Sequence, residues 1–249
     1  MATLALTVAG SDSSGGAGIQ ADLLTFAAFG VRGASVVTAL TAQNTRGVRA
    51  IVPVAPEFVV QQLDAILDDV AVAAAKTGML HRAAVIEAVA ERLRERPVPH
   101  LVVDPVMVAT TGAVLLEPEA VARLRARLLP LATLVTPNLH EAEVLTGRAV
   151  SDPAEMRAAA RALVEMGARA ALVTGGHLAG AEALDMLYDG RGFREFRAPR
   201  IATRHTHGTG CALSAAVTAG LALGQPLDEA IAAAKRHVTA ALGARETSA

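Results

Sequence analysis

The segment from His207 to Cys211 combines residue types that can bind an anion and move a proton. It reads His-Gly-Thr-Gly-Cys, and a long apolar run follows it. Two glycines let successive backbone N–H groups point into one hollow, and the N-terminus of a following helix adds partial positive charge. The pattern therefore predicts an anion-binding loop that needs no cationic side chain.

Cys211 is the only cysteine of the chain and lies at the rim of this loop. A helix N-terminus favours a nearby thiolate, and the effect can lower the pKa of a thiol to about 7.5. Such a thiol could act as a base or a nucleophile near neutral pH. The alternative is that Cys211 is a small buried apolar side chain.

Two further glycine clusters follow apolar runs, at residues 10–18 and at Gly175-Gly176. The first contains Gly-Ala-Gly-Ile-Gln-Ala, which satisfies the loose dinucleotide-binding pattern. That pattern needs an acidic residue at the end of the next strand to hold a ribose. The next apolar run ends in Gln43-Asn44, which disfavours an NAD-linked oxidoreductase, and no GxxxxGK[ST] phosphate loop occurs.

The charge composition limits both the partners and the chemistry. The 249 residues carry 23 basic and 24 acidic side chains, and Lys76 and Lys235 are the only lysines. The net charge of −1 and the 2% aromatic content argue against a nucleic-acid partner. Any phosphate chemistry must therefore work almost without lysine.

The chemistry-bearing segments follow elements of a repeated strand–helix pattern. Six continuous apolar runs are typical of strands buried on both faces: Leu4–Ala9, Ala34–Leu40, Val72–Lys76, Leu101–Asp104, Thr133–Thr136 and Ala170–Thr174. Helix-period patterns lie at 16–29, 56–70, 82–93, 208–223 and 226–242, and Ser151-Asp152-Pro153 opens another helix. Leu184–Tyr188 and Phe193–Arg197 flank an Asp-Gly-Arg-Gly turn and predict a hairpin.

This alternation predicts an α/β fold with a mostly parallel sheet covered by helices on both faces. We expect one domain over residues 1–249, with ligands outside the carboxyl ends of the strands. The apolar start, residues 1–8, has no cationic flank typical of a signal peptide, and glycines and Pro226 break the uncharged run 205–227. We expect a cytoplasmic protein with no membrane partner.

Six motifs together resemble the hydroxymethylpyrimidine/phosphomethylpyrimidine kinases of the ribokinase-like superfamily. In chain order they are Ala9–Asp22, Thr41-Ala42-Gln43-Asn44-Thr45, Lys76-Thr77-Gly78-Met79-Leu80, Val103-Asp104-Pro105-Val106-Met107, Thr136–Glu143 and Thr206–Cys211. The resemblance implies a three-layer αβα sandwich and a homodimer. It also implies ATP-dependent phosphorylation of 4-amino-5-hydroxymethyl-2-methylpyrimidine, and then of its monophosphate, in thiamine biosynthesis.

The resemblance also implies a role for particular residues. Cys211 would be the catalytic base, and the Gly208 and Gly210 amides would hold the transferring phosphoryl group. The pyrimidine pocket would comprise Gly10, Asp22, Gln43, Met79 and Val106. The ATP and phosphate contacts would come from Asn138, Thr174, Gly175, His207 and Thr209. Asp104 and Glu141 would hold Mg²⁺, directly or through water.

These assignments are chemically reasonable, and each has a structural alternative. Gln43 offers a donor and an acceptor to a ring nitrogen and an exocyclic amine, and Met79 and Val106 offer apolar walls. Met79 and Val106 could equally be core residues. Asp22 could be a solvated helix residue and Glu141 an ordinary first-turn acid of a helix.

The sequence departs from the family pattern at two positions that face the nucleotide phosphates. Family members often have lysine where this chain has Thr110 and Thr174. A non-catalytic pyrimidine-binding protein therefore stays open as an alternative. A pyridoxal kinase of the same superfamily is a second alternative, because some cysteine-bearing relatives act on pyridoxal. The loops 109–114 and 176–183 contain glycine and are candidates for a lid.

Overall fold

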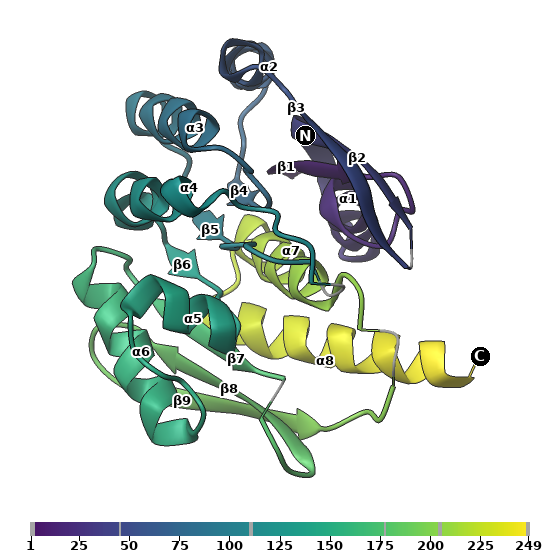
Figure 1. Ribbon diagram of the computed structural model, residues 1–249, viewed down its shortest axis with the longest axis vertical. Coiled ribbons are helices and arrows are strands. Elements are labelled where there is room, and N and C mark those ends of the chain that lie inside the picture. The colour runs from purple at the N-terminus through teal and green to yellow at the C-terminus, as the bar shows by residue number, and fades with distance from the viewer. Residues whose placement is uncertain (1–2, 45, 110–111, 177, 204–205, 248–249) are drawn as a thin grey trace.

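A single nine-stranded sheet runs through the molecule (Figure 1). The computed structural model describes residues 3–44, 46–109, 112–176, 178–203 and 206–247. The sheet order is β3-β2-β1-β4-β5-β6-β7-β8-β9. The strands are β1 (Leu4–Asp12), β2 (Arg32–Asn44), β3 (Gly47–Pro53), β4 (Ala74–Thr77), β5 (Leu101–Val103), β6 (Leu134–Val135), β7 (Ala171–Gly175), β8 (Glu182–Tyr188) and β9 (Phe193–Pro199).

The six strands from β2 to β7 are parallel, and antiparallel strands extend the sheet at both edges. The six predicted strands and the predicted β8–β9 hairpin are confirmed. Strand β1 shows why continuous apolar runs identify the parallel strands of the sheet. Eight of its nine residues are buried. Strands covered by helices on both faces have no reason to alternate apolar and polar residues.

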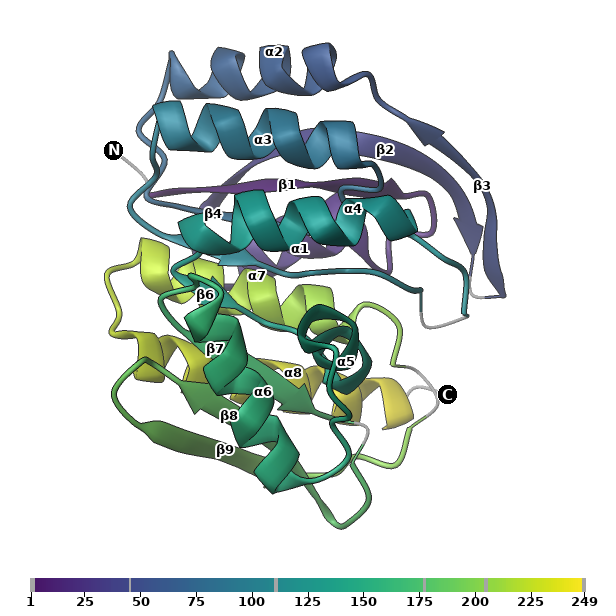
Figure 2. The ribbon, with the colours of Figure 1, turned by 60° about the vertical axis from the view of Figure 1, so that its left-hand side comes forward.

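Helices cover both faces of the sheet, as the resemblance implies (Figure 2). One layer contains α1 (Gly18–Ala28), α7 (Thr209–Ala222) and α8 (Leu227–Thr247). The other contains α2 (Pro56–Leu67), α3 (Ala83–Glu95), α4 (Pro118–Arg123), α5 (Leu139–Thr146) and α6 (Pro153–Glu165). α4 continues through a π-helical turn, Leu124–Leu128, into a 3₁₀ turn, Leu129–Leu131.

The sequence analysis missed strand β3 and stopped β2 four residues early. β3 pairs only with β2, and its residues are exposed or half-buried. An edge strand with so little burial lacks the continuous apolar run that identifies the inner strands. α4 was also not predicted, because its six residues are too few for a helical period to stand out.

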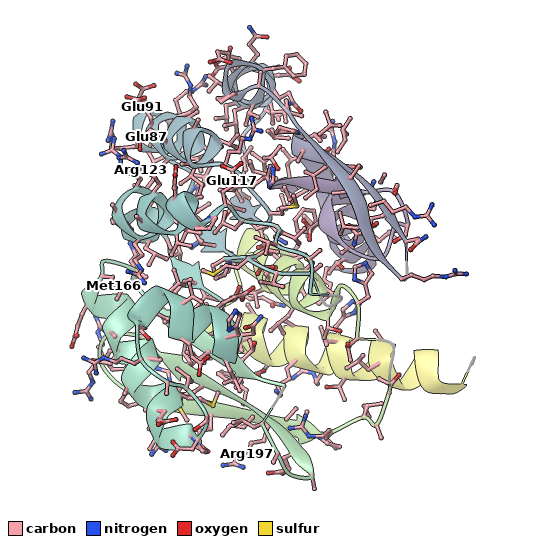
Figure 3. All side chains as sticks on the ribbon, viewed as in Figure 1. Glu87, Glu91, Glu117, Arg123, Met166 and Arg197 are labelled. Atoms are coloured by element: carbon pink, nitrogen blue, oxygen red, sulfur yellow. The ribbon has the colours of Figure 1, made fainter. Side chains whose placement is uncertain are left out.

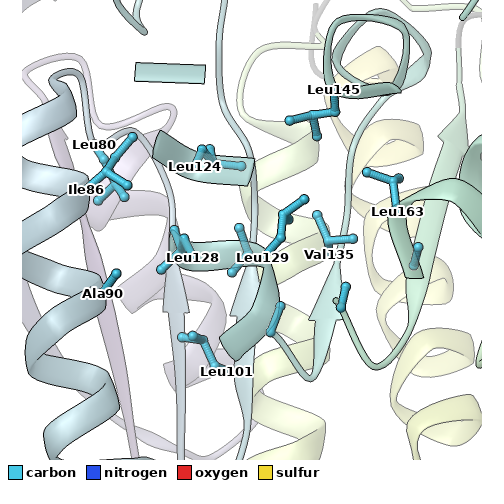
Figure 4. Packing of buried hydrophobic residues seen from close by; sticks show 14 of the residues in the cluster. Leu80, Ile86, Ala90, Leu101, Leu124, Leu128, Leu129, Val135, Leu145 and Leu163 are labelled. Atoms are coloured by element: carbon cyan, nitrogen blue, oxygen red, sulfur yellow. The ribbon is translucent and has the colours of Figure 1, made fainter. Parts of the chain in front are cut away.

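The larger core lies between the sheet and the helices α2–α6. Leu80, Ile86, Leu124 and Leu128 are buried there and approach one another from three separate segments (Figure 4). Charged side chains such as Glu91 and Arg123 lie on the outer face of α3 and α4 (Figure 3). In the part of the chain that the structure describes, no helix combines the length and apolarity needed to cross a bilayer.

The placement of the core predicts that two leucines in surface helices contribute very differently to the free energy of unfolding. Leu63 of α2 is 0% exposed, whereas Leu24 of α1 is 69% exposed. Leu63→Ala should lower the free energy of unfolding by about 2–5 kcal/mol, because it leaves a cavity. Leu24→Ala should change it by less than about 0.5 kcal/mol. Urea denaturation measures both, and equal losses would contradict this placement of the core.

Candidate active site

The carboxyl ends of the parallel strands lie along one edge of the sheet (Figure 1), and most of the predicted site residues lie at these strand ends or in the segments that follow them. Gly10 lies near the end of β1, Gln43 near the end of β2, Met79 after β4, Asp104 and Val106 after β5, Asn138 after β6, and Thr174 and Gly175 at the end of β7. Parallel pairing thus brings together residues from the whole length of the chain.

The loop before α7 packs directly on the loop after β1. Gly208 has a φ of +77°, and a Cβ atom there would collide with the carbonyl oxygen of Gly16. Thr209 tightens the turn, since its hydroxyl donates to the carbonyl of Thr206 at 2.6 Å. Among the described residues, no side chain caps the N-terminus of α7. The N–H of Thr209 donates to the Thr206 carbonyl at 3.2 Å, and the hollow of N–H groups expected from the glycine pattern stays a prediction.

An apolar wall forms beside this loop. Met79 is buried with Ala39 and Leu115, and Val106 packs against the same cluster. Gly10 lies against it, because a Cβ atom there would come within 3.1 Å of the Met79 sulfur. A flat ring could pack against this wall from the edge of the sheet. The predicted wall residues are therefore brought together, and their contact with a pyrimidine stays a prediction.

Asp22 is not a solvated helix residue. It is fully buried, accepts a hydrogen bond from the Thr7 hydroxyl at 2.6 Å, and pairs with the Lys76 ammonium at 2.7 Å. Lys76 Nζ also lies 3.7 Å from Asp104 Oδ2, which accepts from the Ser214 hydroxyl at 2.8 Å. Asp22 thus lies beneath the site and is linked to Asp104 by the Lys76 ammonium.

The sequence analysis gave no role to Lys76, Ser214 or Asp12. A lysine within a fully buried strand was the available signal, because a buried cation requires a buried acid. Burial alone would lower the pKa of Lys76, but the nearby carboxylates outweigh burial and raise it. Lys76 is therefore a permanent cation beneath the site.

The predicted pKa of Cys211, near 7.5, is wrong. Burial, together with the nearby carboxylates of Asp104 and Asp22, raises the pKa of the thiol to about 12. Lys76 and the backbone N–H of Gly18 act in the opposite direction, and they do not compensate. The helix N-terminus was recognised in the sequence, but the buried acids that oppose it come from distant segments.

Asp104 and Glu141 form an acidic pair near the nucleotide side of the site. Burial, reinforced by the Asp104 charge, raises the pKa of Glu141 to about 8. Glu141 also completes a capping box with Asn138, in which each side chain accepts from the other residue's backbone N–H at 3.0 Å. The described residues contain no cluster of three or more metal-ligating side chains.

The end of β7 is held from behind by the second lysine. The Asp185 carboxylate accepts from the Gly175 N–H at 3.2 Å and from the Lys235 ammonium at 2.6 Å. Gly175 has no room for a side chain, because a Cβ atom would collide with the Leu184 carbonyl. Both lysines of the chain are therefore paired with buried aspartates. Thr174 Oγ1 lies 3.5 Å from the Pro137 carbonyl, whereas Thr110 lies outside the described residues.

Comparisons with known proteins agree with this geometry. The model of the phosphomethylpyrimidine kinase family matches residues 12–248. A hydroxymethylpyrimidine/phosphomethylpyrimidine kinase from Rhizobium meliloti is 56% identical over 247 residues, which cover 99% of this chain and 92% of that protein.

Two solved structures share both the fold and much of the sequence. A phosphomethylpyrimidine kinase from Clostridium difficile 630 has a TM-score of 0.86 and 41% identity, covering 96% of this chain and 99% of that one. An ADP complex of Bacillus subtilis pyridoxal kinase has a TM-score of 0.88 and 42% identity, covering 95% and 90%. Fold and site thus define a small-molecule kinase with the ribokinase-like architecture. The chain belongs to the phosphomethylpyrimidine kinase family.

The buried lysine predicts a large effect on stability. Lys76→Met leaves the Asp22 and Asp104 charges without a partner and should cost about 3–5 kcal/mol in urea denaturation. Lys76→Met combined with Asp22→Asn should recover part of that loss. Arg94→Met, which breaks the exposed Arg94–Glu91 pair, should cost no more than about 1 kcal/mol. A single variant no less stable than the double variant would contradict the ion pair.

The raised pKa of Cys211 predicts slow alkylation. Below pH 12 the thiolate fraction rises tenfold per pH unit, so the iodoacetamide rate should rise about tenfold per unit from pH 7 to 10 without a plateau. Cys211→Ser should take up no label, because the chain has no other cysteine. A plateau by pH 8 would show instead that the helix N-terminus dominates.

Proposed function

We propose that this protein transfers the γ-phosphate of ATP to 4-amino-5-hydroxymethyl-2-methylpyrimidine and then phosphorylates the monophosphate to the diphosphate, in thiamine biosynthesis. The observation that carries the proposal is the place of Cys211. It lies in the first turn of α7, where the glycine loops meet and the apolar wall is close by. Membership of the phosphomethylpyrimidine kinase family supports the same reaction.

The pyrimidine ring would lie against Met79 and Val106, with Gly10 leaving room for it. Gln43 would read the ring edge, because its carboxamide carries both a donor and an acceptor. Asp22 would contribute indirectly, by holding Lys76 beneath the pocket. This assignment places the substrate's hydroxymethyl group toward Cys211.

The nucleotide would bind across the ends of β6 and β7, near Asn138, Thr174 and Gly175, with His207 and Thr209 on the α7 side. Its γ-phosphate would lie at the N-terminus of α7. Backbone N–H groups there bind charge without a lysine, which fits the threonine at position 174. Lys76 adds a fixed positive charge below the loop.

Asp104 and Glu141 fit a divalent cation. Burial, reinforced by the Asp104 charge, raises the pKa of Glu141 to about 8, and a bound cation would offset the negative charge of these carboxylates. Mg²⁺ needs only one or two carboxylates, because water and phosphate oxygens complete its shell. When bound, it would neutralise charge on the nucleotide phosphates.

In the first step the substrate hydroxyl attacks the γ-phosphorus, and the bond to ADP breaks. The hydroxyl proton goes to Cys211, and the amides of Gly208 and Gly210 stabilise the charge on the transferring group. A thiol with a pKa near 12 is rarely ionised at neutral pH, so only the small thiolate fraction acts as base. In the second step the nucleophile is a phosphate that is already ionised, and it needs no base.

A pyridoxal kinase is the second candidate, since the Bacillus subtilis pyridoxal kinase shares 42% identity with this chain. Both substrates present a primary alcohol on a flat aromatic ring. Relative turnover separates the candidates, because faster phosphorylation of pyridoxal than of the pyrimidine would favour the second.

We also propose one kinase domain over residues 1–249, a cytoplasmic location and a homodimer. The exposed β2–β3 ribbon supports the dimer. Leu40 and Val52 are register partners on this ribbon and are 52% and 60% exposed. A neighbouring apolar pair at a sheet edge is suited to cover by a second copy.

The two steps should respond differently to loss of the thiol. Cys211→Ala should lower kcat on the alcohol by about 100-fold or more, the usual contribution of a general base. It should lower kcat on the monophosphate by less than about tenfold, because that nucleophile has no proton to lose. ADP release with each substrate measures both steps.

The pH dependence provides the control for this assignment. In the wild-type protein, kcat/KM on the alcohol should rise from pH 7 to 9 relative to that on the monophosphate, because the thiolate fraction rises. Cys211→Ala should abolish that difference. Equal losses on both substrates would remove Cys211 from the proton transfer.

A further inference from the structure

His207 lies between the two loops and contacts a residue from each of two strands. Its Nε2 atom lies 2.9 Å from Asp12 Oδ2 at the end of β1. The same Nε2 atom lies 3.4 Å from Nε2 of the Gln43 carboxamide on β2. One ring nitrogen therefore faces both a carboxylate and the side chain expected to read the substrate.

The charge of Asp12 determines whether Nε2 of His207 donates or accepts a hydrogen bond. Its carboxylate accepts from the Ser14 N–H and hydroxyl at 2.8 Å and from the Ala17 N–H at 2.9 Å. Burial would raise the pKa of Asp12, but the hydrogen bonds from His207 and Ser14 outweigh it and lower the pKa. An ionised carboxylate only accepts hydrogen bonds, so Nε2 of His207 must carry the hydrogen.

A ring nitrogen that donates to Asp12 cannot accept from the NH₂ group of Gln43. The carboxamide has nearly the same shape either way round, so its hydrogen bonds decide its orientation. With its oxygen toward His207, the N–H of the ring finds a second acceptor. This orientation exchanges the nitrogen and oxygen of the carboxamide relative to the structure, so that the NH₂ group takes the place of Oε1, 3.1 Å from Thr41 Oγ1.

The surroundings of Thr41 favour the same orientation. Its single hydroxyl hydrogen donates to the Ser11 carbonyl at 3.0 Å. The hydroxyl oxygen is then left to accept from the Gln43 NH₂ group. In the opposite orientation this one hydrogen would have to serve two acceptors, and two donors would face each other at His207.

The ring of His207 has little freedom to leave this position. A Cβ atom on Gly16 would lie 2.6 Å from Cδ2 and 3.1 Å from Nε2 of the ring. The imidazole thus packs against the bare backbone of the loop after β1, with Asp12 on one side. Gly16 is the residue that makes room for it.

We propose that His207, held by Asp12, is a positioning residue that sets the orientation of the Gln43 carboxamide and so selects which ring edge the pocket accepts. The inference rests on the proposed function. A carboxamide fixed in this way presents to the substrate the remaining lone pair of its oxygen on one side and its second N–H on the other, and the two cannot change places. That order matches a ring with an exocyclic amine beside an acceptor nitrogen. It rejects the corresponding oxo ring, whose carbonyl and ring N–H present the reverse order.

Calorimetric binding of two ligands without ATP tests the inference. The probes are 4-amino-5-hydroxymethyl-2-methylpyrimidine and its 4-oxo analogue. The wild-type protein should bind the amino compound at least about tenfold more tightly, since a mispaired edge leaves polar groups unsatisfied. His207→Phe keeps a flat ring but no donor, so the ratio of the two Kd values should fall to within about threefold.

Two glycine variants complete the experiment. Gly16→Ala displaces the His207 ring without altering it and should also lower the ratio. Gly192→Ala is the matched control, because its Cβ atom would meet nothing within 4 Å, and it should leave the ratio unchanged. General damage to the fold would weaken both ligands alike and leave the ratio as it is.

The outcomes separate the inference from the proposed function. Failure of the wild-type protein to bind either ligand would overturn the proposed function itself. Preference of the wild type for the amino compound, unchanged in both His207→Phe and Gly16→Ala, would overturn the positioning role alone. If His207→Phe does not fold by circular dichroism, the ratio measured with Gly16→Ala decides.

Discussion

The buried ion pair between Lys76 and Asp22 is the interaction on which the site depends. An unpaired charge inside a protein costs several kcal/mol, so the two residues must stay together in the folded state. Their contact ties α1 to β4, and the Thr7 hydroxyl ties the same carboxylate to β1. Asp104 joins the cluster from the loop after β5. The elements that carry the predicted site residues are thus held together by one cation.

The same cluster sets the electrostatics of the reaction centre. Asp22 and Asp104 lie near one ammonium, Glu141 lies within the field of Asp104, and Cys211 is buried within the field of the two aspartates. The thiol is therefore harder to ionise than its place at a helix N-terminus suggests. An environment this acidic suits a cation, which would be needed to offset the repulsion between these acids and a phosphoryl group. The scarcity of lysine has a structural counterpart, because both lysines serve as buried partners of aspartates.

The loop after β1 and the loop before α7 approach each other closely. Gly208 and Gly16 let these loops touch, and the space left by Gly16 receives the imidazole of His207. Through Asp12 and Gln43, this ring connects the phosphate-binding loop to the side chain that would read the pyrimidine. The two loops thus meet at one contact formed by Gly16, Gly208 and His207.

The sequence by itself determined the parallel sheet, the helix layers and the glycine loops at the strand ends, because continuous apolar runs and turn residues act locally. It did not reveal strand β3, whose exposed residues lack such a run. It placed Cys211 at a helix N-terminus but predicted its pKa in the wrong direction. Only the tertiary structure decided that pKa and the partner of Lys76. The burial of a group and the charge around it depend on residues that are distant in sequence. A local sequence pattern therefore cannot predict them.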